Sequence, residues 1–254
     1  MPEPRQRSRT LNPATAALQP AVFTRLLPTI QAMAEKPIPL HIGDTFLPPP
    51  PAARLDRVAA NLTDRTYAYS APNGLPSLRE AFCERWTRLG KADLDVERVH
   101  VTVGATGGVF AALQAFVRPG DEVLLLSPFW PLVRGMITAL GATAIEVPFY
   151  LNLDPEHGVA DLIAPHISAR TTAIYICSPN NPSGAILDRP QSEALARFCV
   201  DNDLWVISDE AYVDYAFAPH VHQFMADLPG MAERTASVYT ASKSYALAGI
   251  RVGF

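Results

Sequence analysis

The sequence predicts a three-layer α/β fold, in which a mainly parallel sheet is covered by helices on both faces. From about residue 100 onward, short apolar runs alternate with helix-like segments, and the run Ala173-Ile174-Tyr175-Ile176 is continuously apolar. A strand that is apolar throughout is typical of a parallel sheet buried on both faces. The composition agrees, because 48% hydrophobic and 18% charged residues are typical of a globular chain.

The N-terminal region differs from the rest of the chain. Residues 1 to about 20 are polar and punctuated by proline, which predicts an irregular arm. Residues 22–34 have apolar side chains at helical spacing and are expected to form a helix. We therefore assign residues 1–45 to an N-terminal arm and helix.

The remaining residues, 46–254, are expected to form one large domain. Prolines at residues 48–51 connect to two amphipathic helices, expected at residues 52–62 and 77–89. Strands are predicted at residues 100–103, 122–126, 143–147, 172–177, 204–208 and 237–240. Helices are predicted between them at residues 107–117, 131–140, 160–167 and 189–202. Parallel sheets bind ligands outside the carboxyl ends of their strands, so the loops that follow these strands are candidate sites.

Composition and charge exclude several classes of protein. The formal net charge of −4 gives no basic surface for nucleic acid or an anionic membrane. No segment approaches the roughly 20 apolar residues of a membrane span, and no apolar signal segment follows the N-terminal arginines. Cys83, Cys177 and Cys199 are widely spaced, which fits reduced core thiols better than disulfides or a zinc site. A cytoplasmic protein that acts on small molecules is expected.

Three loops after predicted strands carry residues suited to a ligand site. The loop at residues 103–108 is rich in glycine and could let a phosphate approach the backbone, although a plain tight turn explains it equally well. The loop at residues 178–184, Ser-Pro-Asn-Asn-Pro-Ser-Gly, consists of turn formers. Asp209 directly follows the strand predicted at residues 204–208, a place where a carboxylate serves either a site or a helix N-cap. Each loop alone is weak evidence, but all three lie where a ligand would bind.

The fourth loop contains Lys243, one of only three lysines beside eighteen arginines. An ordinary lysine is a solvated surface charge. Lys243 instead follows an apolar strand, lies among small hydroxyl residues and precedes Arg251 by eight positions. This setting indicates a functional amine.

Together the four loops resemble the class I/II aminotransferases, which are pyridoxal 5'-phosphate (PLP) enzymes of fold type I. The matching motifs are Asn-Pro-Ser-Gly at residues 181–184, Asp-x-x-Tyr at 209–212, Ser-Lys at 242–243 and Gly-x-Arg-x-Gly at 249–253. The likeness extends over residues 22–254, including Gly43-Asp44 and residues 69–80. It implies the cofactor-binding large domain of that fold, PLP as cofactor, and transfer of an amino group between an amino acid and a 2-oxo acid.

The resemblance also implies catalytic roles for matching residues. Lys243 would hold PLP as a Schiff base and later move a proton at the alpha carbon of the substrate. Asp209 would pair with the pyridinium nitrogen of the cofactor, and Asn181 and Tyr212 would bind its ring hydroxyl oxygen. Trp130 would stack on the ring, or else serve only in core packing.

Further residues would bind the cofactor phosphate or the substrate. The phosphate ligands implied by the resemblance are Ala105 and Thr106 through their backbone, and Thr240, Ser242, Arg251 and Tyr69 through their side chains. Tyr69 would come from the neighbouring subunit, which implies a homodimer. Gly43 would lie near the substrate carboxylate and Asn181 would also contact the substrate, although a plain turn glycine is the alternative for Gly43.

The chain departs from the family pattern at its end. Family members continue past the position of Phe254 into a C-terminal small domain, so we expect that domain to be absent and the chain to be a fragment or a truncated product. The alternatives to an aminotransferase are another PLP enzyme of the same fold, such as a beta-lyase or decarboxylase, or a truncated non-catalytic remnant. His220 and His222 lack a third ligand in the sequence nearby, so no metal is expected.

Overall fold

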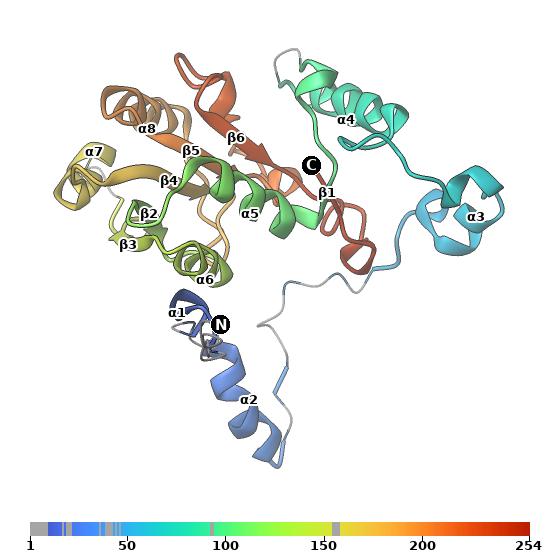
Figure 1. The fold of residues 1–254 in the computed structure, drawn as a ribbon, viewed down its shortest axis with the longest axis horizontal. Helices are drawn as coiled ribbons and strands as arrows, with labels where there is room; N and C mark the ends of the chain where they lie inside the picture. Colours follow the sequence, from blue (N-terminus) through green and yellow to red (C-terminus); the bar gives the residue numbers. More distant parts are fainter. Residues whose placement is uncertain are drawn as a thin grey trace, which may run out of the picture.

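A five-stranded parallel sheet forms the centre of the fold (Figure 1). In spatial order its strands are β3 (Thr143–Pro148), β2 (Glu122–Ser127), β4 (Thr171–Cys177), β5 (Trp205–Asp209) and β6 (Thr235–Val238). Asp209 pairs with Cys177 on one side and with Val238 on the other, so three strands end at one edge of the sheet. The computed structural model describes residues 10–16, 18, 22–35, 37, 38, 43, 45, 47–91, 94–153 and 158–254.

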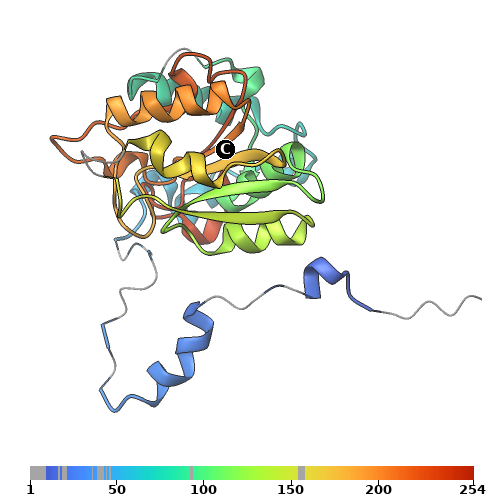
Figure 2. The same ribbon diagram turned by 90° about the vertical axis from the view of Figure 1, so that its left-hand side faces the viewer.

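Helices cover both faces of this sheet, as predicted. The helices are α5 (Gly104–Phe116) and α6 (Leu132–Ala139) on one face, and α7 (Val159–Ile163) and α8 (Arg189–Asp201) on the other. Figure 2 shows α8 and α6 on opposite sides of the strands. In β4, Ala173, Tyr175 and Cys177 join the apolar cluster under α5 and α6, while Ile174 and Ile176 join the cluster under α7 and α8. Both faces of β4 are therefore buried, which explains its unbroken apolar run.

The sheet continues past β6 through backbone that changes its pairing partner. Tyr239 donates its N–H to the carbonyl oxygen of Phe254 at 2.9 Å, and Phe254 donates back at 3.0 Å. Strand β7 (Val252–Gly253) then pairs antiparallel with β1 (Thr102–Val103). The strand expected at residues 237–240 is thus wrong in its bounds, because parallel pairing ends at Val238 and the next residues pair with β7. This pairing brings β7 beside the start of α5.

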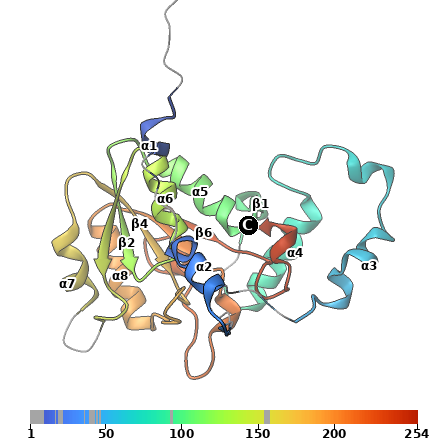
Figure 3. The same cartoon turned by 90° about the horizontal axis from the view of Figure 1, so that it is seen from below.

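The part of the chain before β1 contains four α-helices in the described ranges. They are α1 (Pro13–Ala16), α2 (Val22–Ala32), α3 (Leu55–Ala59) and α4 (Pro76–Arg88). In Figure 3, α3 lies away from the strands, at the end of the molecule opposite α7. Two parts of the sequence discussed in the sequence analysis lie outside the described residues. They are residues 1–9 of the arm and Asp44, which follows Gly43.

Two predicted helices are shorter than expected. The helix at residues 52–62 is reduced to α3, because Arg54 before it is extended (ψ 139°), and its apolar side chains Leu55 and Leu62 are exposed and so contribute little burial. The helix at residues 160–167 becomes α7 followed by a 3₁₀ turn that contains Pro165, which cannot donate a helical hydrogen bond. The 3₁₀ helices are Pro51–Ala53, Asp64–Tyr67, Val96–Arg98, Ala164–His166, Val213–Tyr215, Met225–Asp227 and Ala248–Ile250.

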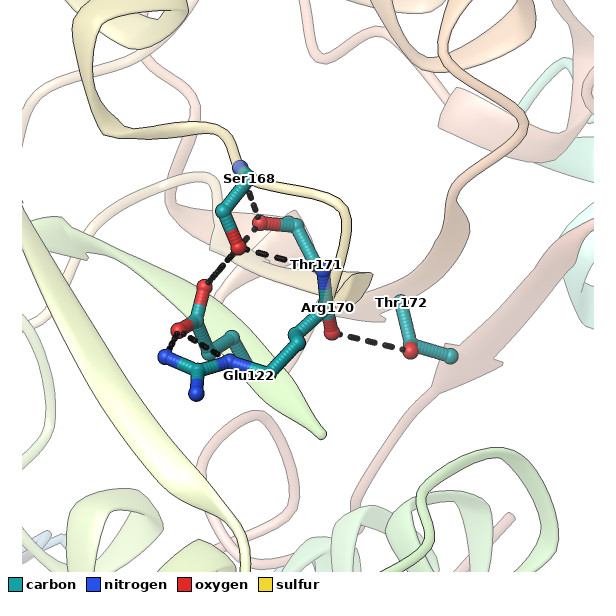
Figure 4. Close-up of polar contacts among 5 residues, drawn as sticks. All are labelled: Glu122, Ser168, Arg170, Thr171 and Thr172. Atoms are coloured by element: carbon teal, nitrogen blue, oxygen red, sulfur yellow. Dashed lines mark hydrogen bonds and ion pairs between the residues drawn. The ribbon is translucent and has the colours of Figure 1, made fainter. Parts of the chain in front are cut away.

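A buried carboxylate fastens the amino ends of β2 and β4, at the sheet edge opposite Asp209 (Figure 4). Glu122 accepts hydrogen bonds from Ser168 Oγ at 2.5 Å and from Arg170 Nε at 3.0 Å. These bonds hold the pKa of the Glu122 carboxyl below its usual range. The cluster supports the strand pairing and lies away from the loops that carry the motif residues.

Among the described residues, the helices are all too short or too polar to cross a lipid bilayer.

Candidate active site

The structure brings the amine of Lys243 next to two other predicted site residues. Its Nζ donates a hydrogen bond to the carbonyl oxygen of Gly43, a residue 200 positions earlier in the chain, and lies 5.6 Å from the ring centroid of Tyr212. A Cβ atom added at Gly43 would lie 3.2 Å from Tyr212 Oη and 3.7 Å from Lys243 Nζ. Gly43 therefore borders the space around the amine, where a side chain would crowd both groups.

Asn181 and Tyr212 form the polar pair beside this amine. Asn181 Nδ2 donates to the hydroxyl oxygen of Tyr212 at 3.4 Å, joining the loop after β4 to the loop after β5. Burial raises the pKa of Tyr212 above its ordinary value, and the charge of Asp209 adds to this effect. Tyr212 is consequently a neutral hydroxyl at neutral pH, able to donate a hydrogen bond to a ligand oxygen.

Asn180, the residue before Asn181, shapes the loop. Its Nδ2 donates to the carbonyl oxygen of Pro128 at 3.1 Å, and its Oδ1 accepts from Ser183 Oγ at 2.6 Å. Its backbone N–H donates to Ala185 O at 2.8 Å. Asn180 thus ties the loop after β4 to the loop after β2, while Asn181 faces Tyr212. The sequence alone did not assign different tasks to the two adjacent asparagines.

Asp209 is buried at the carboxyl end of β5, with 6% of its surface exposed. Tyr175 Oη donates to its Oδ2 at 2.6 Å, and the backbone N–H of Ala211 donates to its Oδ1 at 3.2 Å. Burial raises the pKa of Asp209, while these hydrogen bonds and the charge of Lys243 oppose the rise. Since a buried carboxylate is costly without a cation nearby, a positive group brought close to Asp209 would be stabilised.

A second group of residues surrounds the first turn of α5. Arg251 adopts the left-handed conformation (φ 63°, ψ 48°), and its carbonyl oxygen accepts the Gly104 N–H at 3.1 Å. Its Nη1 donates to Ala248 O at 2.8 Å and contacts Ser242 Oγ at 3.5 Å. Ser242 Oγ in turn accepts a hydrogen bond from Thr240 Oγ1 at 2.8 Å. Arg251, Ser242 and Thr240 therefore lie together beside the helix.

Helix α5 begins at Gly104, three residues before the predicted start at residue 107. Ala105 and Thr106 are therefore within its first turn, where backbone N–H groups have no acceptor inside the helix. The positive end of the helix dipole and the Arg251 guanidinium both favour an anion here. Residues Gly104, Ala105, Thr106, Thr240, Ser242 and Arg251 are called the anion cradle below.

Two predicted site residues stand apart from these groups. Tyr69 is fully exposed, at 107% of its reference surface, so no other part of its own chain covers it. Trp130 follows β2, is half-buried and packs against the apolar cluster under α5 and α6. The chain therefore assembles the other predicted residues without Tyr69, and it uses Trp130 at least in part as a core residue.

Two buried tyrosines beneath the site were not predicted. Tyr175 contacts Asp209 directly, and Tyr150 Oη donates to the carbonyl oxygen of Cys177 at 2.8 Å. In the sequence, Tyr175 belongs to the continuous apolar run that predicts the parallel sheet, and that pattern indicates no role at a site. The Tyr175 hydroxyl is the one feature of the sequence that could have indicated the contact, because a buried tyrosine hydroxyl needs a hydrogen-bond partner.

His222, one of the two histidines discussed in the sequence analysis, lies beside a buried carboxylate. His222 Nε2 lies 3.4 Å from Oε2 of the buried Glu210, whose Oε1 accepts from Ser208 Oγ at 3.0 Å. The described ranges contain no group of three or more histidine, cysteine or acidic side chains placed to hold a metal ion.

Comparison with known proteins places this geometry in a family. The family model for aminotransferase class I and II matches residues 35–254. The arginine–pyruvate transaminase of Pseudomonas aeruginosa is 37% identical over 218 residues, which cover 85% of this chain and 54% of that protein. The aspartate aminotransferase of Pyrococcus abyssi is 34% identical over 232 residues, covering 91% and 59%.

A solved structure shows the same fold. The aspartate aminotransferase of Thermus thermophilus, solved with maleate, has a TM-score of 0.80 and 30% sequence identity, covering 97% of this chain and 64% of that one. The chain spans about half the length of the curated relatives it matches. Because the family model matches far more than half of this chain, and the fold is the parallel three-layer fold of these relatives, the chain belongs to the class I and II aminotransferase family.

Proposed function

We propose that this chain carries the PLP site of an aminotransferase that moves an amino group between an amino acid and a 2-oxo acid. One observation carries the proposal. The amine of Lys243 lies beside Tyr212 and within the electrostatic reach of buried Asp209, and the next residue back, Ser242, belongs to the anion cradle. Enzymes of the class I and II family use PLP as cofactor.

The residues present fit the chemical groups of PLP. The cofactor carries an aldehyde, a ring nitrogen, a ring hydroxyl and a phosphate. The amine of Lys243 would bind the aldehyde, and the buried carboxylate of Asp209 would bind the ring nitrogen. The Asn181–Tyr212 pair would hold the ring hydroxyl, and the anion cradle would hold the phosphate. The fit is tightest at Gly104, where an added Cβ would lie 2.7 Å from Arg251 Cζ, so the guanidinium lies directly over the helix N-terminus. Arginine there suits a phosphate, because its planar fork makes bidentate contacts.

Each residue would contribute a defined step. Lys243 would act as the nucleophile and as the carrier of a proton to and from the alpha carbon of the substrate. When bound, PLP supplies an electron sink for that carbon. Asp209 would hold a proton on the ring nitrogen, and an ion pair of this kind at about 4 Å and an effective dielectric near 20 is worth about 4 kcal/mol. Tyr212 would donate its neutral hydroxyl to the ring oxygen.

The same proposal includes a second copy of the chain. Tyr69 points into solvent, and the side chain is expected to complete the anion cradle of a partner subunit in a homodimer. Its exposure supports this role, since a buried Tyr69 could not reach another subunit. The substrates of the proposed reaction are an amino acid and a 2-oxo acid.

Reduction with borohydride in the presence of PLP tests the cofactor site. We expect stoichiometric attachment of the reduced cofactor to the peptide that contains Lys243, together with a visible absorption band before reduction. The chain has only three lysines, so peptide mapping is unambiguous. Lys243→Ala should lose both signals, and the matched variant Lys36→Ala should keep them. Equal labelling of all three lysines would overturn the proposed site.

A single half-reaction separates the aminotransferase from its alternatives. The PLP-loaded protein, given one amino acid and no acceptor, should release one equivalent of 2-oxo acid and then stop. Release of ammonia or carbon dioxide with continued turnover would indicate a lyase or a decarboxylase. Labelling of Lys243 without any product would indicate a non-catalytic remnant.

A further inference from the structure

Tyr175 lies directly beneath the carboxylate at the end of β5. Its side chain is 1% exposed, and it occupies the middle of β4, where the register pairs it with Ile207. Cys177, two residues on, pairs with Asp209. The side chain of Tyr175 therefore starts one step below Asp209 on the same face and reaches its Oδ2 at 2.6 Å.

The Tyr175 hydroxyl can donate a hydrogen bond throughout the pH range around neutrality. Burial, with the charge of Asp209 as the second cause, raises the pKa of Tyr175 well above its ordinary value. The phenol therefore keeps its proton and gives it to the carboxylate as a hydrogen bond. A length of 2.6 Å is that of a charge-assisted O–H···O bond, which is about twice as strong as a neutral one.

The two donors to Asp209 fix its rotation. Tyr175 binds Oδ2 and the N–H of Ala211 binds Oδ1, so neither oxygen can turn without losing a bond. Both donors are electrically neutral, so they orient the carboxylate without cancelling its charge. The charge stays available for a cationic group of a ligand.

We propose that Tyr175 is a positioning residue, which holds the Asp209 carboxylate in place for the protonated ring nitrogen of PLP. The proposal rests on the proposed function, because it requires PLP to bind with its ring nitrogen toward Asp209. Phenylalanine would fill nearly the same volume in this apolar strand without the bond. The hydroxyl therefore serves Asp209 and not the packing of the sheet.

A matched pair of variants tests this role. Tyr175→Phe removes the hydroxyl that binds the carboxylate, and Tyr150→Phe removes a second buried hydroxyl, which binds the backbone of Cys177 instead. Affinity is measured for PLP and for its analogue with C–H in place of the ring nitrogen. We expect Tyr175→Phe to weaken PLP binding about tenfold and to leave binding of the analogue within about twofold. Tyr150→Phe should change both affinities alike.

A spectroscopic measurement checks the same point without turnover. With ¹⁵N-labelled PLP bound, the nitrogen chemical shift reports the proton on the ring. In Tyr175→Phe the ring nitrogen should lose its proton at lower pH than in wild type and in Tyr150→Phe. An unchanged titration, together with an unchanged ratio of the two affinities, would overturn the role of Tyr175 and leave the proposed function intact.

A comparison within the Asp209→Asn background covers the case in which the Tyr175→Phe single variant fails to fold. In the Asp209→Asn background, removal of the Tyr175 hydroxyl no longer leaves a carboxylate short of a donor, and PLP affinity should not fall further. An additional tenfold loss in that background would mean that Tyr175 acts independently of Asp209. If wild type itself takes up no PLP at Lys243, the proposed function fails, and this inference fails with it.

Discussion

The anion cradle depends on one missing methyl group. Gly104 has φ +67°, which glycine adopts without strain, and the Arg251 guanidinium occupies the space that a Cβ would need. The glycine thus serves both the backbone turn into α5 and the close approach of the cation. At the carboxyl end of β5, Asp209 shows a similar dependence on its neighbours, because burial opposes its charge and Tyr175 supports it.

Substitution of Gly104 by alanine should weaken PLP binding about ten- to a hundredfold, because the displaced Arg251 loses its charge-assisted contact with phosphate. The control is Gly120→Ala, at a glycine with φ +93° and open space around the added Cβ. Both variants carry the cost of a left-handed alanine, about 1–2 kcal/mol. Titration of PLP and thermal unfolding separate the two effects. Equal dissociation constants for the two variants would contradict the account of the cradle.

At the scale of elements, the two edges of the sheet have separate tasks. The carboxyl edge gathers the loops after β4, β5 and β6. Asp214, in the loop after β5, binds Ser244, the residue after Lys243 in the loop after β6. Asp214 also binds Arg85 of α4. The amino edge carries Glu122, which fastens β2 to the turn before β4. Stability at one edge can therefore change without a change in the chemistry at the other.

Glu122→Gln should lower the midpoint of thermal unfolding by a few degrees at pH 7 and leave PLP affinity within about twofold. The pKa of Glu122 is lowered in the folded state, so its contribution is present above the unfolded value and is lost as pH falls below about 4.5. The wild type and the variant should thus converge in acid. Glu84→Gln is the control and should shift little, because the Glu84 carboxylate and its partner Arg88, 3.9 Å away, are both exposed. A difference that persists unchanged into acid would argue against an ionised Glu122.

At the scale of the whole molecule, the segment before α4 exposes apolar side chains. Leu47, Leu55, Tyr67 and Tyr69 each expose more than half of their reference surface. Several exposed apolar side chains in one segment are typical of a surface that contacts another protein. It supports the proposed homodimer, in which Tyr69 of the partner subunit completes the anion cradle.

Mixing two defective variants tests the shared site. Lys243→Ala lacks the amine, and Tyr69→Ala lacks the contact expected for the neighbouring site. A mixed dimer has one site with both defects and one with neither, so an equal mixture should recover about a quarter of the wild-type tight sites. Quantitative PLP labelling after co-refolding measures this recovery. No gain over the separate variants would argue that Tyr69 acts within its own chain or not at all.

The sequence by itself determined the fold class and the motif residues. Continuous apolar runs and helices with period 3.6 are local patterns, so the strands were found within a few residues of their observed bounds. Lys243, Asp209, Asn181, Tyr212 and Arg251 lie in short motifs, and the resemblance of these motifs to those of the class I/II aminotransferases implied the chemistry. The roles of these residues, and the boundary near residue 45, stay predictions.

Only the tertiary structure decided which groups meet. The contact of Lys243 with Gly43 joins residues 200 positions apart, and the bond from Tyr175 to Asp209 depends on the register of β4 against β5. The change of pairing partner after Val238, where Tyr239 bonds to Phe254, likewise decides where Arg251 lies. Such contacts depend on strand pairing and burial across the whole fold, and these long-range interactions leave no trace in local residue patterns.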